Sequence, residues 1–524
     1  MVDAIVIGSG FGGAVTACRL AERGLRVVVL ERGRRWDPAN YPRAPGDPWI
    51  FDVDRPEKRN GWLDFRIFDD MMVAQGAGVG GGSLIYANVS IPAPPATFTT
   101  GWPPEITSQE LEPHYLRVGE MLGVQVLPDN QEPERTRLMR EAARGIGAGD
   151  RFRKVPVAVT FDPDYRPTLP DPQSHRHSKT WVNPFGQQQG TCVHLGYCDI
   201  GCPVKAKNTL DLNYLARAEQ LGVEIRPLHL VRVIRPAGQG YLVEGDRIGG
   251  GHRTPFREQA ARVVVAAGSL NSTELLLRCR DEYHTLPLLS RRLGDQWSSN
   301  GDFLTPAWYR EREAPIAPTV GPTITAAIDF LDGSRHGARF FIEDGGLPDL
   351  FRAYLDEAVR RPVWSFRWRR LLKHLRRATE RHNVIRDMMP WFAQGVDAAD
   401  GRLRLARPWY APWRRALRLD WDIAASRRTI KAIIKTHEEL SRATGGEPDV
   451  PLTWSLLENL ITPHPLGGCV VGRSAADGVV DHRGAVFGYP GLYLADGSIV
   501  PEALGLNPSR TIAALAERIA ALID

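Results

Sequence analysis

A glycine-rich turn between two apolar strands is the feature that most restricts how this chain can fold. Residues 4–7 and 26–30 are rich in β-branched side chains, which predicts two strands, and the pattern over 14–23 predicts a helix between them. The turn after the first strand reads Gly8-Ser9-Gly10-Phe11-Gly12-Gly13. Such glycines let the backbone approach a pyrophosphate at the helix N-terminus, as in Rossmann-like α/β folds.

Glu31 lies at the end of the second predicted strand, about 20 residues beyond the turn. A carboxylate at this place can accept hydrogen bonds from ribose hydroxyls, and it repels a 2′-phosphate. The turn, the strand and helix around it and Glu31 therefore predict a dinucleotide site. These residues alone do not distinguish FAD from NAD.

Later stretches repeat the small, glycine-punctuated character of this unit, at 76–87, 262–277 and 491–519. We assign them to one cofactor-binding domain made of 1–91, 191–300 and 451–524. The intervening segments carry more Pro, Trp and charge. They are expected to form a discontinuous α+β substrate-binding domain with a lid, made of 92–190 and 301–450.

Composition limits the class of protein. A net charge of +5 over 524 residues is too weak to indicate nucleic-acid binding, and no apolar run reaches the ~18 residues of a spanning helix. The chain starts without a basic segment followed by a long apolar run, and its six cysteines do not form a disulfide framework. We expect a cytoplasmic protein.

Five further pieces, in this order, resemble the glucose-methanol-choline (GMC) oxidoreductase family, and within it the cholesterol oxidase branch, over nearly the whole chain. They are residues 76–84, 267–272, 464–469, 496–498 and 505–508. The resemblance implies FAD as the cofactor. It also implies that the FAD is bound non-covalently, because no histidine occurs between Met71 and Pro92, where some relatives attach the flavin.

Two residues are the candidates for catalysis. His464 lies between two prolines, and a histidine suits proton transfer because its ordinary pKa is near working pH. Asn507 precedes Pro508 at the predicted start of the last helix, 509–523, where its amide can donate a hydrogen bond without titrating. By resemblance, His464 and Asn507 hold the substrate oxygen over the flavin. Taken alone, Asn507 is also a plausible helix cap.

The other site residues are expected to contact the cofactor. By the glycine turn, the ribose acid and the resemblance, they are Gly8, Gly10, Phe11, Gly12, Gly13, Glu31, Gly78, Gly80, Gly82, Ser83, Val231, Ala267, Gly268, Asp496, Gly497 and Pro508. By resemblance, Asp496 reaches the ribityl or pyrophosphate part of FAD.

The resulting hypothesis is an FAD-dependent oxidoreductase of steroid metabolism that oxidises the hydroxyl of a bulky apolar alcohol, a sterol, with reoxidation by oxygen. One alternative is a dehydrogenase of a long-chain, terpenoid or sugar alcohol that uses another electron acceptor. A second is a flavin-binding protein without turnover. Cholesterol oxidases that also isomerise their product use an additional glutamate. Glu343 lies in the corresponding part of the chain but not in a matching context, so isomerisation stays open.

Two other features have competing interpretations. Cys192, Cys198 and Cys202, with His194 between the first two, match no common zinc spacing. We interpret them as a structural thiol cluster and expect no metal. Residues 360–386 alternate Arg or Lys with Trp, Phe and Leu, which fits either peripheral contact with an anionic membrane or a solvated helix packed on its own domain.

Overall fold

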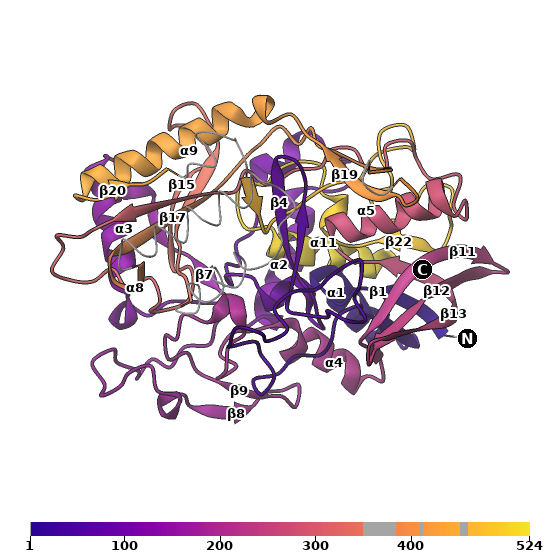
Figure 1. Cartoon of the computed structure of the whole chain (residues 1–524), viewed down its shortest axis with the longest axis horizontal. Coiled ribbons are helices and arrows are strands. Elements are labelled where there is room, and N and C mark those ends of the chain that lie inside the picture. The colour runs from indigo at the N-terminus through magenta and orange to yellow at the C-terminus, as the bar shows by residue number, and fades with distance from the viewer. Residues whose placement is uncertain (1, 349–383, 409–411, 451–459) are drawn as a thin grey trace.

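The computed structural model describes residues 2–348, 384–408, 412–450 and 460–524. Two sheets lie side by side in it (Figure 1), one in the half that holds both chain termini and one beneath the long helix α9 (Ile423–Ala443). Segments distant in sequence combine in each sheet. The chain therefore crosses between the two halves several times.

The first sheet is the Rossmann-like one. Its parallel centre joins β10, β2, β1 and β13, with β22 on the other side of β13, while β12 and β11 extend it as an antiparallel meander. All four residues of β2 are buried, as expected for a β-branched run inside a parallel sheet covered on both faces. The strands are β1 (Val2–Ile7), β2 (Val27–Leu30), β10 (Glu224–Arg226), β11 (His229–Ala237), β12 (Gly240–Gly249), β13 (His252–Val265) and β22 (Leu492–Leu494).

The helices of this half pack on one another beside the sheet. Helix α1 contacts α4 and α11, and α11 contacts α2. A buried carboxylate holds α1, α4 and α11 together, since Glu517 of α11 pairs with Arg19 of α1 at 2.8 Å and accepts a hydrogen bond from Tyr214 of α4. The helices are α1 (Phe11–Glu22), α2 (Ser108–Met121), α4 (Tyr214–Gln220), α5 (Ser269–Leu277) and α11 (Ser509–Leu522).

The second sheet is antiparallel, in the order β20-β14-β17-β16-β15-β6. Helix α9 contacts β14, β16 and β17, and α3 (Glu134–Gly145) contacts α9 and β15. Asp422 caps α9 by accepting a hydrogen bond from Ala424 N at 2.9 Å. The strands are β6 (Phe152–Lys154), β14 (Phe303–Trp308), β15 (Ala326–Phe330), β16 (Phe340–Asp344), β17 (Met388–Gly395) and β20 (Glu447–Pro448).

A smaller sheet connects the two halves. Strands β3 (Leu63–Ile67) and β4 (Met71–Gly76) form a hairpin, and β21 (Leu460–Thr462) adds to β4 in parallel. Shorter elements complete the described fold: β5 (Gln125–Val126) with β7 (Pro156–Val157), β8 (Thr180–Val182) with β9 (Gln188–Gly190), β18 (Arg402–Ala406) with β19 (Ala416–Asp420), and the short helix α8 (Val384–Asp387).

The predicted α/β fold class is confirmed. Helix α1 begins at Phe11, inside the glycine turn, which is earlier than the expected residue 14. Strand β13 begins at His252, ten residues before the predicted apolar run, because its polar first half pairs with β12 at the exposed end of the sheet. The division into two discontinuous domains stays a proposal.

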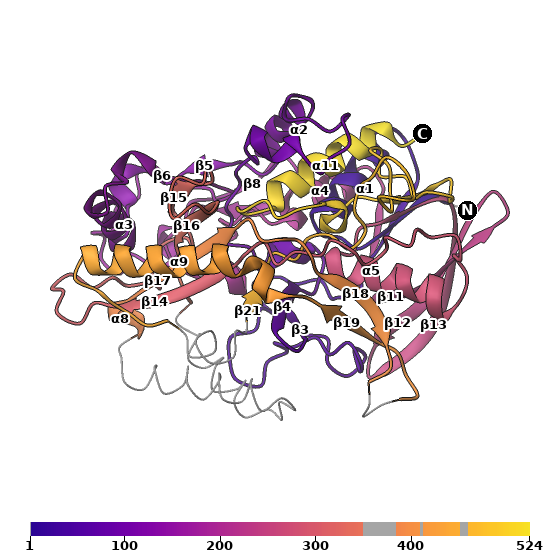
Figure 2. The same ribbon diagram turned by 90° about the horizontal axis from the view of Figure 1, so that it is seen from above.

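The basic aromatic stretch 360–386 lies outside the described residues except for its last three. Figure 2 gives the arrangement of the described elements from above. Among those elements, no helix is long and apolar enough to cross a membrane. Peripheral contact with a membrane and a cytoplasmic location both remain predictions.

Candidate active site

A cavity of about 960 Å³ is lined by residues of both main sheets and of the connecting hairpin. We call the part beside the turn at 8–12 its cofactor end, and the part beside His464 and Asn507 its reaction end. Most of the residues predicted to bind the cofactor line it: Gly8, Gly10, Phe11, Gly12, Glu31, Gly82, Val231, Ala267, Gly268, Asp496, Gly497 and Pro508.

Four predicted cofactor residues lie behind this lining and shape it. Gly13 packs on the turn itself, since a Cβ there would lie 2.0 Å from Gly8 O. Gly80 has a φ of +104° and begins the short helix η1 (Gly81–Leu84). The hydroxyl of Ser83 donates to Gly80 O at 2.8 Å, and a Cβ on Gly78 would lie 2.4 Å from the ring of Trp36. These residues set the path of the backbone.

The glycines of the first turn have two different reasons to lack a side chain. A Cβ on Gly12 would lie 1.6 Å from Ala495 O, and one on Gly8, whose φ is +97°, would lie 2.4 Å from Ala266 O. A Cβ on Gly10 would have no atom nearer than 3.9 Å. Gly8 and Gly12 are therefore required by packing within the protein, whereas Gly10 leaves space in the cavity.

Glu31 joins the first turn to the segment that follows β2. Its carboxylate accepts hydrogen bonds from Ser9 N at 3.1 Å, Ser9 Oγ at 2.7 Å and Gly33 N at 2.8 Å. The hydroxyl of Ser9 in turn accepts from Gly80 N at 3.1 Å. A carboxylate has about four acceptor positions, so Glu31 keeps capacity for a ribose hydroxyl while it holds the loop together.

Like Glu31, Asp496 lines the cavity and also accepts hydrogen bonds from two segments of the protein. One carboxylate oxygen accepts from Gly268 N at 2.8 Å and from Ser272 Oγ at 2.5 Å, and the other accepts from Ser498 N at 2.8 Å. It therefore joins the loop after β13 to the loop after β22 at the edge of the cavity. In this structure its hydrogen bonds are made to the protein, and contact with the ribityl or pyrophosphate part of FAD stays a prediction.

The N-terminus of α11 opens on the reaction end. Asn507, Pro508 and Ser509 line the cavity there, and the helix runs from Ser509 to Leu522, which is one residue shorter than the predicted 509–523. Unpaired N–H groups and the macrodipole make such an end favourable for negative charge. That the flavin ring of bound FAD lies here stays a prediction from the family resemblance.

His464 is held by a carboxylate that the sequence analysis did not select. Its Nδ1 lies 2.9 Å from Oδ1 and 3.1 Å from Oδ2 of Asp302, whose side chain is fully buried. The hydroxyl of Thr462 lies 2.6 Å from Asp302 Oδ2 and accepts from His464 N at 2.9 Å. Burial disfavours the imidazolium, but the Asp302 carboxylate outweighs it and raises the pKa of His464 above its ordinary value.

Asn507 lies against a second buried acid, Glu343 of β16. Its Nδ2 is 3.5 Å from Glu343 Oε2, which also accepts from Gln394 Nε2 at 2.8 Å. Glu343 Oε1, Gln394 Oε1 and Asn507 Oδ1 are buried without a hydrogen-bond partner among the described residues. Burial raises the pKa of Glu343 to about 8, so at neutral pH it is mostly protonated.

Sequence reasoning missed Asp302 and Gln394, and it left Glu343 unmatched. Each lies on or beside a strand of the second sheet and reaches the site only through the packing of β14, β16 and β17. A weak signal for Asp302 was available, because it is the last polar residue before the mainly apolar run 303–308. Nothing in the local sequence connects it to His464.

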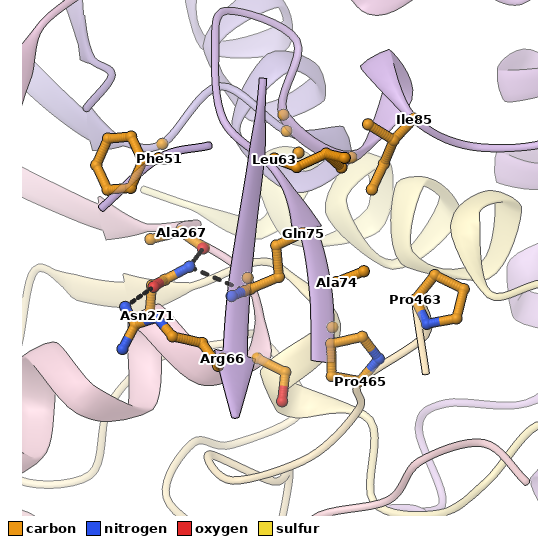
Figure 3. Close-up of a pocket in the computed structure, with 18 of the residues that line it drawn as sticks. Phe51, Leu63, Arg66, Ala74, Gln75, Ile85, Ala267, Asn271, Pro463 and Pro465 are labelled. Atoms are coloured by element: carbon orange, nitrogen blue, oxygen red, sulfur yellow. Dashed lines mark hydrogen bonds between the residues drawn. The ribbon is translucent and has the colours of Figure 1, made fainter. Parts of the chain in front are cut away.

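The connecting hairpin crosses the cavity and is joined to α5 on the far side. Arg66 of β3 donates to Asn271 Oδ1 and pairs with Glu274, both at 3.0 Å. Asn271 in turn donates to Gln75 of β4 at 3.0 Å and to Ala267 O at 3.1 Å. Figure 3 shows Arg66 and Gln75 extending from the two strands toward Asn271, with Pro463 and Pro465 nearby. We call these contacts the hairpin bridge.

The cysteine cluster lies outside the cavity lining. Cys192 and Cys198 are buried free thiols whose pKa is raised by burial, and Cys202 is half-buried. His194 donates its backbone N–H to Cys192 Sγ, and its ring stacks on Tyr165. Within the described ranges, no group of three or more His, Cys, Asp or Glu side chains is placed to hold a metal ion.

Comparison with known proteins gives the family. A sequence model described as GMC oxidoreductase matches residues 397–516, and one described as NAD(P)-binding Rossmann-like domain matches 6–38. A cholesterol oxidase of Mycobacterium tuberculosis is 32% identical over 99% of this chain and 90% of its own. The chain belongs to the GMC oxidoreductase family.

Other relatives also match nearly the whole of this chain. A cholesterol oxidase of Acinetobacter baumannii is 30% identical over 98% of this chain and 93% of its own. A long-chain-alcohol oxidase of Arabidopsis thaliana is 23% identical over 99% and 67%, respectively.

Solved structures share the GMC fold over the whole chain. A formate oxidase of Aspergillus oryzae RIB40 has a TM-score of 0.65 at 14% identity, covering 100% of this chain and 98% of its own. The pyridoxine 4-oxidase of Mesorbium loti has a TM-score of 0.60 at 17% identity, covering 100% and 99%.

FAD is the cofactor of this GMC protein, and the residues present fit it. A backbone cradle without side chains lies at the helix N-terminus of α1, Glu31 lies where a ribose is expected, and the N-terminus of α11 faces the reaction end. The chain is an FAD-dependent alcohol oxidoreductase. The alternative of a flavin-binding protein without turnover is therefore set aside.

Proposed function

We propose that this chain oxidises the hydroxyl of a bulky apolar alcohol, a sterol, and that oxygen reoxidises the enzyme. The proposal depends on one observation: His464 and Asn507 line the same cavity as a group of apolar side chains. These are Val89, Leu304, Ile324, Leu347, Phe392 and Pro463.

The character of these side chains supports an apolar substrate over a sugar alcohol. Burial of apolar surface contributes about 25 cal/mol per Å², which favours a large ring system. The additional hydroxyls of a sugar would lose their hydrogen bonds to water beside Leu304 and Phe392, at a cost of roughly 1–3 kcal/mol each. The cholesterol oxidases and the long-chain-alcohol oxidase among the relatives are consistent with this choice.

The roles of the two polar side chains follow from their contacts. Because Nδ1 of His464 faces Asp302, its Nε2 is the nitrogen left for the substrate hydroxyl, and it takes the hydroxyl proton as general base. The amide of Asn507 orients the substrate oxygen. When bound, FAD accepts the hydride that leaves the carbinol carbon, so the alcohol becomes a ketone by loss of one proton and one hydride.

Anaerobic reduction of the bound flavin tests the substrate. Loss of the visible flavin absorption should be rapid with cholesterol, slower with a linear long-chain alcohol and absent with glucose. Hydrogen peroxide should then form in air in proportion to product. Reduction without peroxide would instead support the dehydrogenase alternative, and no reduction by cholesterol would refute the sterol assignment.

A second activity, isomerisation of the ketone product, is favoured by the position of Glu343 against Asn507. In a sterol with a 3-hydroxyl and a 5,6-double bond, oxidation leaves an acidic C–H between the carbonyl and the alkene. An ionised Glu343 can take this proton and return it two carbons further along, which conjugates the alkene with no change in redox state. The carboxyl does not line the cavity in this structure, so it would reach the substrate past Asn507.

The isomerisation proposal has a specific signature. Glu343→Gln should keep substrate oxidation while the unconjugated ketone accumulates, as measured by the ultraviolet absorption of the conjugated enone. Since the base form is the ionised one and the pKa of Glu343 is about 8, isomerisation by the unmodified enzyme should rise with pH up to about 8 and then level off. Conjugated product at an unchanged rate in Glu343→Gln would remove Glu343 from this role.

A further inference from the structure

One polar loop, residues 298–302, lies directly behind both side chains of the reaction end. It runs from the Gln296 and Trp297 region into β14, and its side chains are almost fully buried, with Asn300 and Asp302 at 0% and 1% exposure. Buried polar groups are costly unless each has a partner. The hydrogen-bond partners of these side chains therefore indicate the role of the loop.

Asp302 is the contact of this loop with His464. Both of its carboxylate oxygens lie within 3.1 Å of the ring Nδ1, and the Thr462 hydroxyl adds a second fixed contact to Oδ2. Whether the ring is neutral or positively charged, the carboxylate can accept a hydrogen bond from it only if Nδ1 carries a hydrogen. The proton of a neutral His464 is therefore held on Nδ1, and the lone pair is left on Nε2.

Asn300 is the contact of the same loop with the segment that carries Asn507. Its Oδ1 accepts hydrogen bonds from Leu504 N and Gly505 N, both at 2.9 Å. Its Nδ2 donates to Leu506 O, also at 2.9 Å. The amide side chain of Asn300 thus forms a hydrogen bond with one backbone group of each of the three residues immediately before Asn507.

The loop itself is fixed to both halves of the protein. Ser298 and Leu466 exchange backbone hydrogen bonds at 3.0 Å, which joins the loop to the His464 segment. On the other side, Asp397 accepts from Ser298 Oγ at 2.7 Å and from Ser299 N at 2.9 Å. The left-handed backbone of Asn300, with a φ of +57°, suits asparagine.

We propose that the 298–302 loop is the element that positions both polar side chains of the reaction. Asp302 sets the tautomer and orientation of His464, and Asn300 sets the turn that presents Asn507. Neither residue touches the substrate, so both act as positioning residues. This inference depends on the proposed oxidation for its kinetic tests only, because the tautomer of His464 can be observed without turnover.

Three acidic groups influence the proton on His464. Asp302 faces the ring directly, Glu343 acts on it from β16, and Asp397 lies behind Asp302. The aromatic ring of Phe392, 6.2 Å away between centroids, covers another side without a charge. Removing the charge of Asp302 removes the group that raises the pKa of His464 most, so this pKa should fall.

The first test is Asp302→Asn, which keeps the shape and removes the charge. The rate of anaerobic flavin reduction at its high-pH plateau should fall at least ~10-fold, and by no more than the roughly 10²–10⁴-fold that general base catalysis contributes in total. The base form of His464 should then appear at lower pH, so the acidic limb of kcat/KM should move to lower pH. In protein labelled with ¹⁵N-histidine, the signal of His464 is identified as the one that is absent from the His464→Gln variant. This signal should show the Nδ1–H tautomer in the unmodified protein, and it should change in Asp302→Asn.

The second test is Asn300→Gly, which permits the positive φ but removes all three side-chain hydrogen bonds. Flavin reduction should slow by up to roughly 10²-fold through misplacement of Asn507. The acidic limb should stay where it is, because Asp302 and His464 are unchanged. Asn300→Asp keeps the acceptor for Leu504 and Gly505, so it should recover part of the lost rate.

Asp481→Asn is the matched control, since Asp481 also accepts backbone N–H groups in a turn, at Arg483 and Ala485, and does not line the cavity. It should change thermal stability without changing the pH profile. An unmoved acidic limb and an unchanged His464 tautomer in Asp302→Asn would overturn the role of Asp302. A normal rate in Asn300→Gly would overturn that of Asn300. Failure of the unmodified enzyme to oxidise any alcohol would refute the proposed function but leave the tautomer measurement valid.

Discussion

The two ends of the cavity are built in different ways. At the cofactor end the wall is mainly backbone, brought close by glycines such as Gly8 and Gly12 that the protein's own packing requires. At the reaction end the wall consists of side chains from separate strands, and the polar ones are held by the 298–302 loop. The shape of the cofactor end depends on the absence of side chains, whereas the geometry of the reaction end depends on which residues its side chains contact.

This difference separates two kinds of sensitivity to mutation. A backbone cradle fails when an added atom has no space, so its failure should appear as loss of folding or of FAD. A site made of side chains fails when a partner is removed, so its failure should appear as loss of rate in a protein that still binds FAD. The predictions below test that separation, from the largest effect to the smallest.

Gly12→Ala should give no FAD-bound protein, because the new Cβ would lie 1.6 Å from Ala495 O. Gly10→Ala is its matched control. Nothing in the protein lies nearer than 3.9 Å to a Cβ there, so this variant should fold normally and lose FAD affinity only because it fills the cavity. Thermal unfolding of the apoprotein and flavin fluorescence titration measure the two effects. Equal stability of both apoproteins would contradict the packing argument.

His464→Ala should slow anaerobic flavin reduction at least ~100-fold, since general base catalysis contributes roughly 10²–10⁴-fold. The absorption spectrum of the bound FAD and the midpoint of thermal unfolding should stay close to those of the unmodified enzyme. Stopped-flow measurement of flavin reduction with the best alcohol substrate checks the rate. A variant that loses FAD instead would place His464 in the cofactor cradle and weaken the distinction between the two ends.

Glu31→Ala should weaken FAD binding by roughly 10- to 150-fold, which corresponds to losing one charge-assisted hydrogen bond of about 1.5–3 kcal/mol. The turnover number at saturating FAD should change little, because Glu31 lies at the cofactor end. A dissociation constant from fluorescence titration measures the effect on FAD binding, and kcat at high FAD concentration measures the effect on turnover. Since Glu31 also holds Ser9 and Gly33, Ser9→Ala separates the loss of loop contacts from the loss of the ribose contact.

The same difference determines what could be predicted from sequence. The α/β fold and the first turn of the cofactor end follow from a short local motif, because a strand, a turn and a helix adjacent in sequence form that turn. FAD and the cofactor residues from later segments were predicted through the family resemblance. His464 and Asn507 were identified through local context and family resemblance. Asp302 and Asn300 were not, because their partners are at least 160 residues away for Asp302 and more than 200 for Asn300. Gln394 was not, because its partner Glu343 is 51 residues away on a neighbouring strand, and local periodicity carries no information on any of these pairings.

The hairpin bridge links the cofactor end of the cavity to the reaction end. Strands β3 and β4 contribute to the cavity lining, and Arg66 fixes the hairpin to Glu274, whose pKa is lowered to about 2 through Arg66 and Arg278 despite burial. The same hairpin pairs with β21, which ends two residues before His464. A shift of the hairpin would therefore be transmitted through β21 to the segment that carries His464.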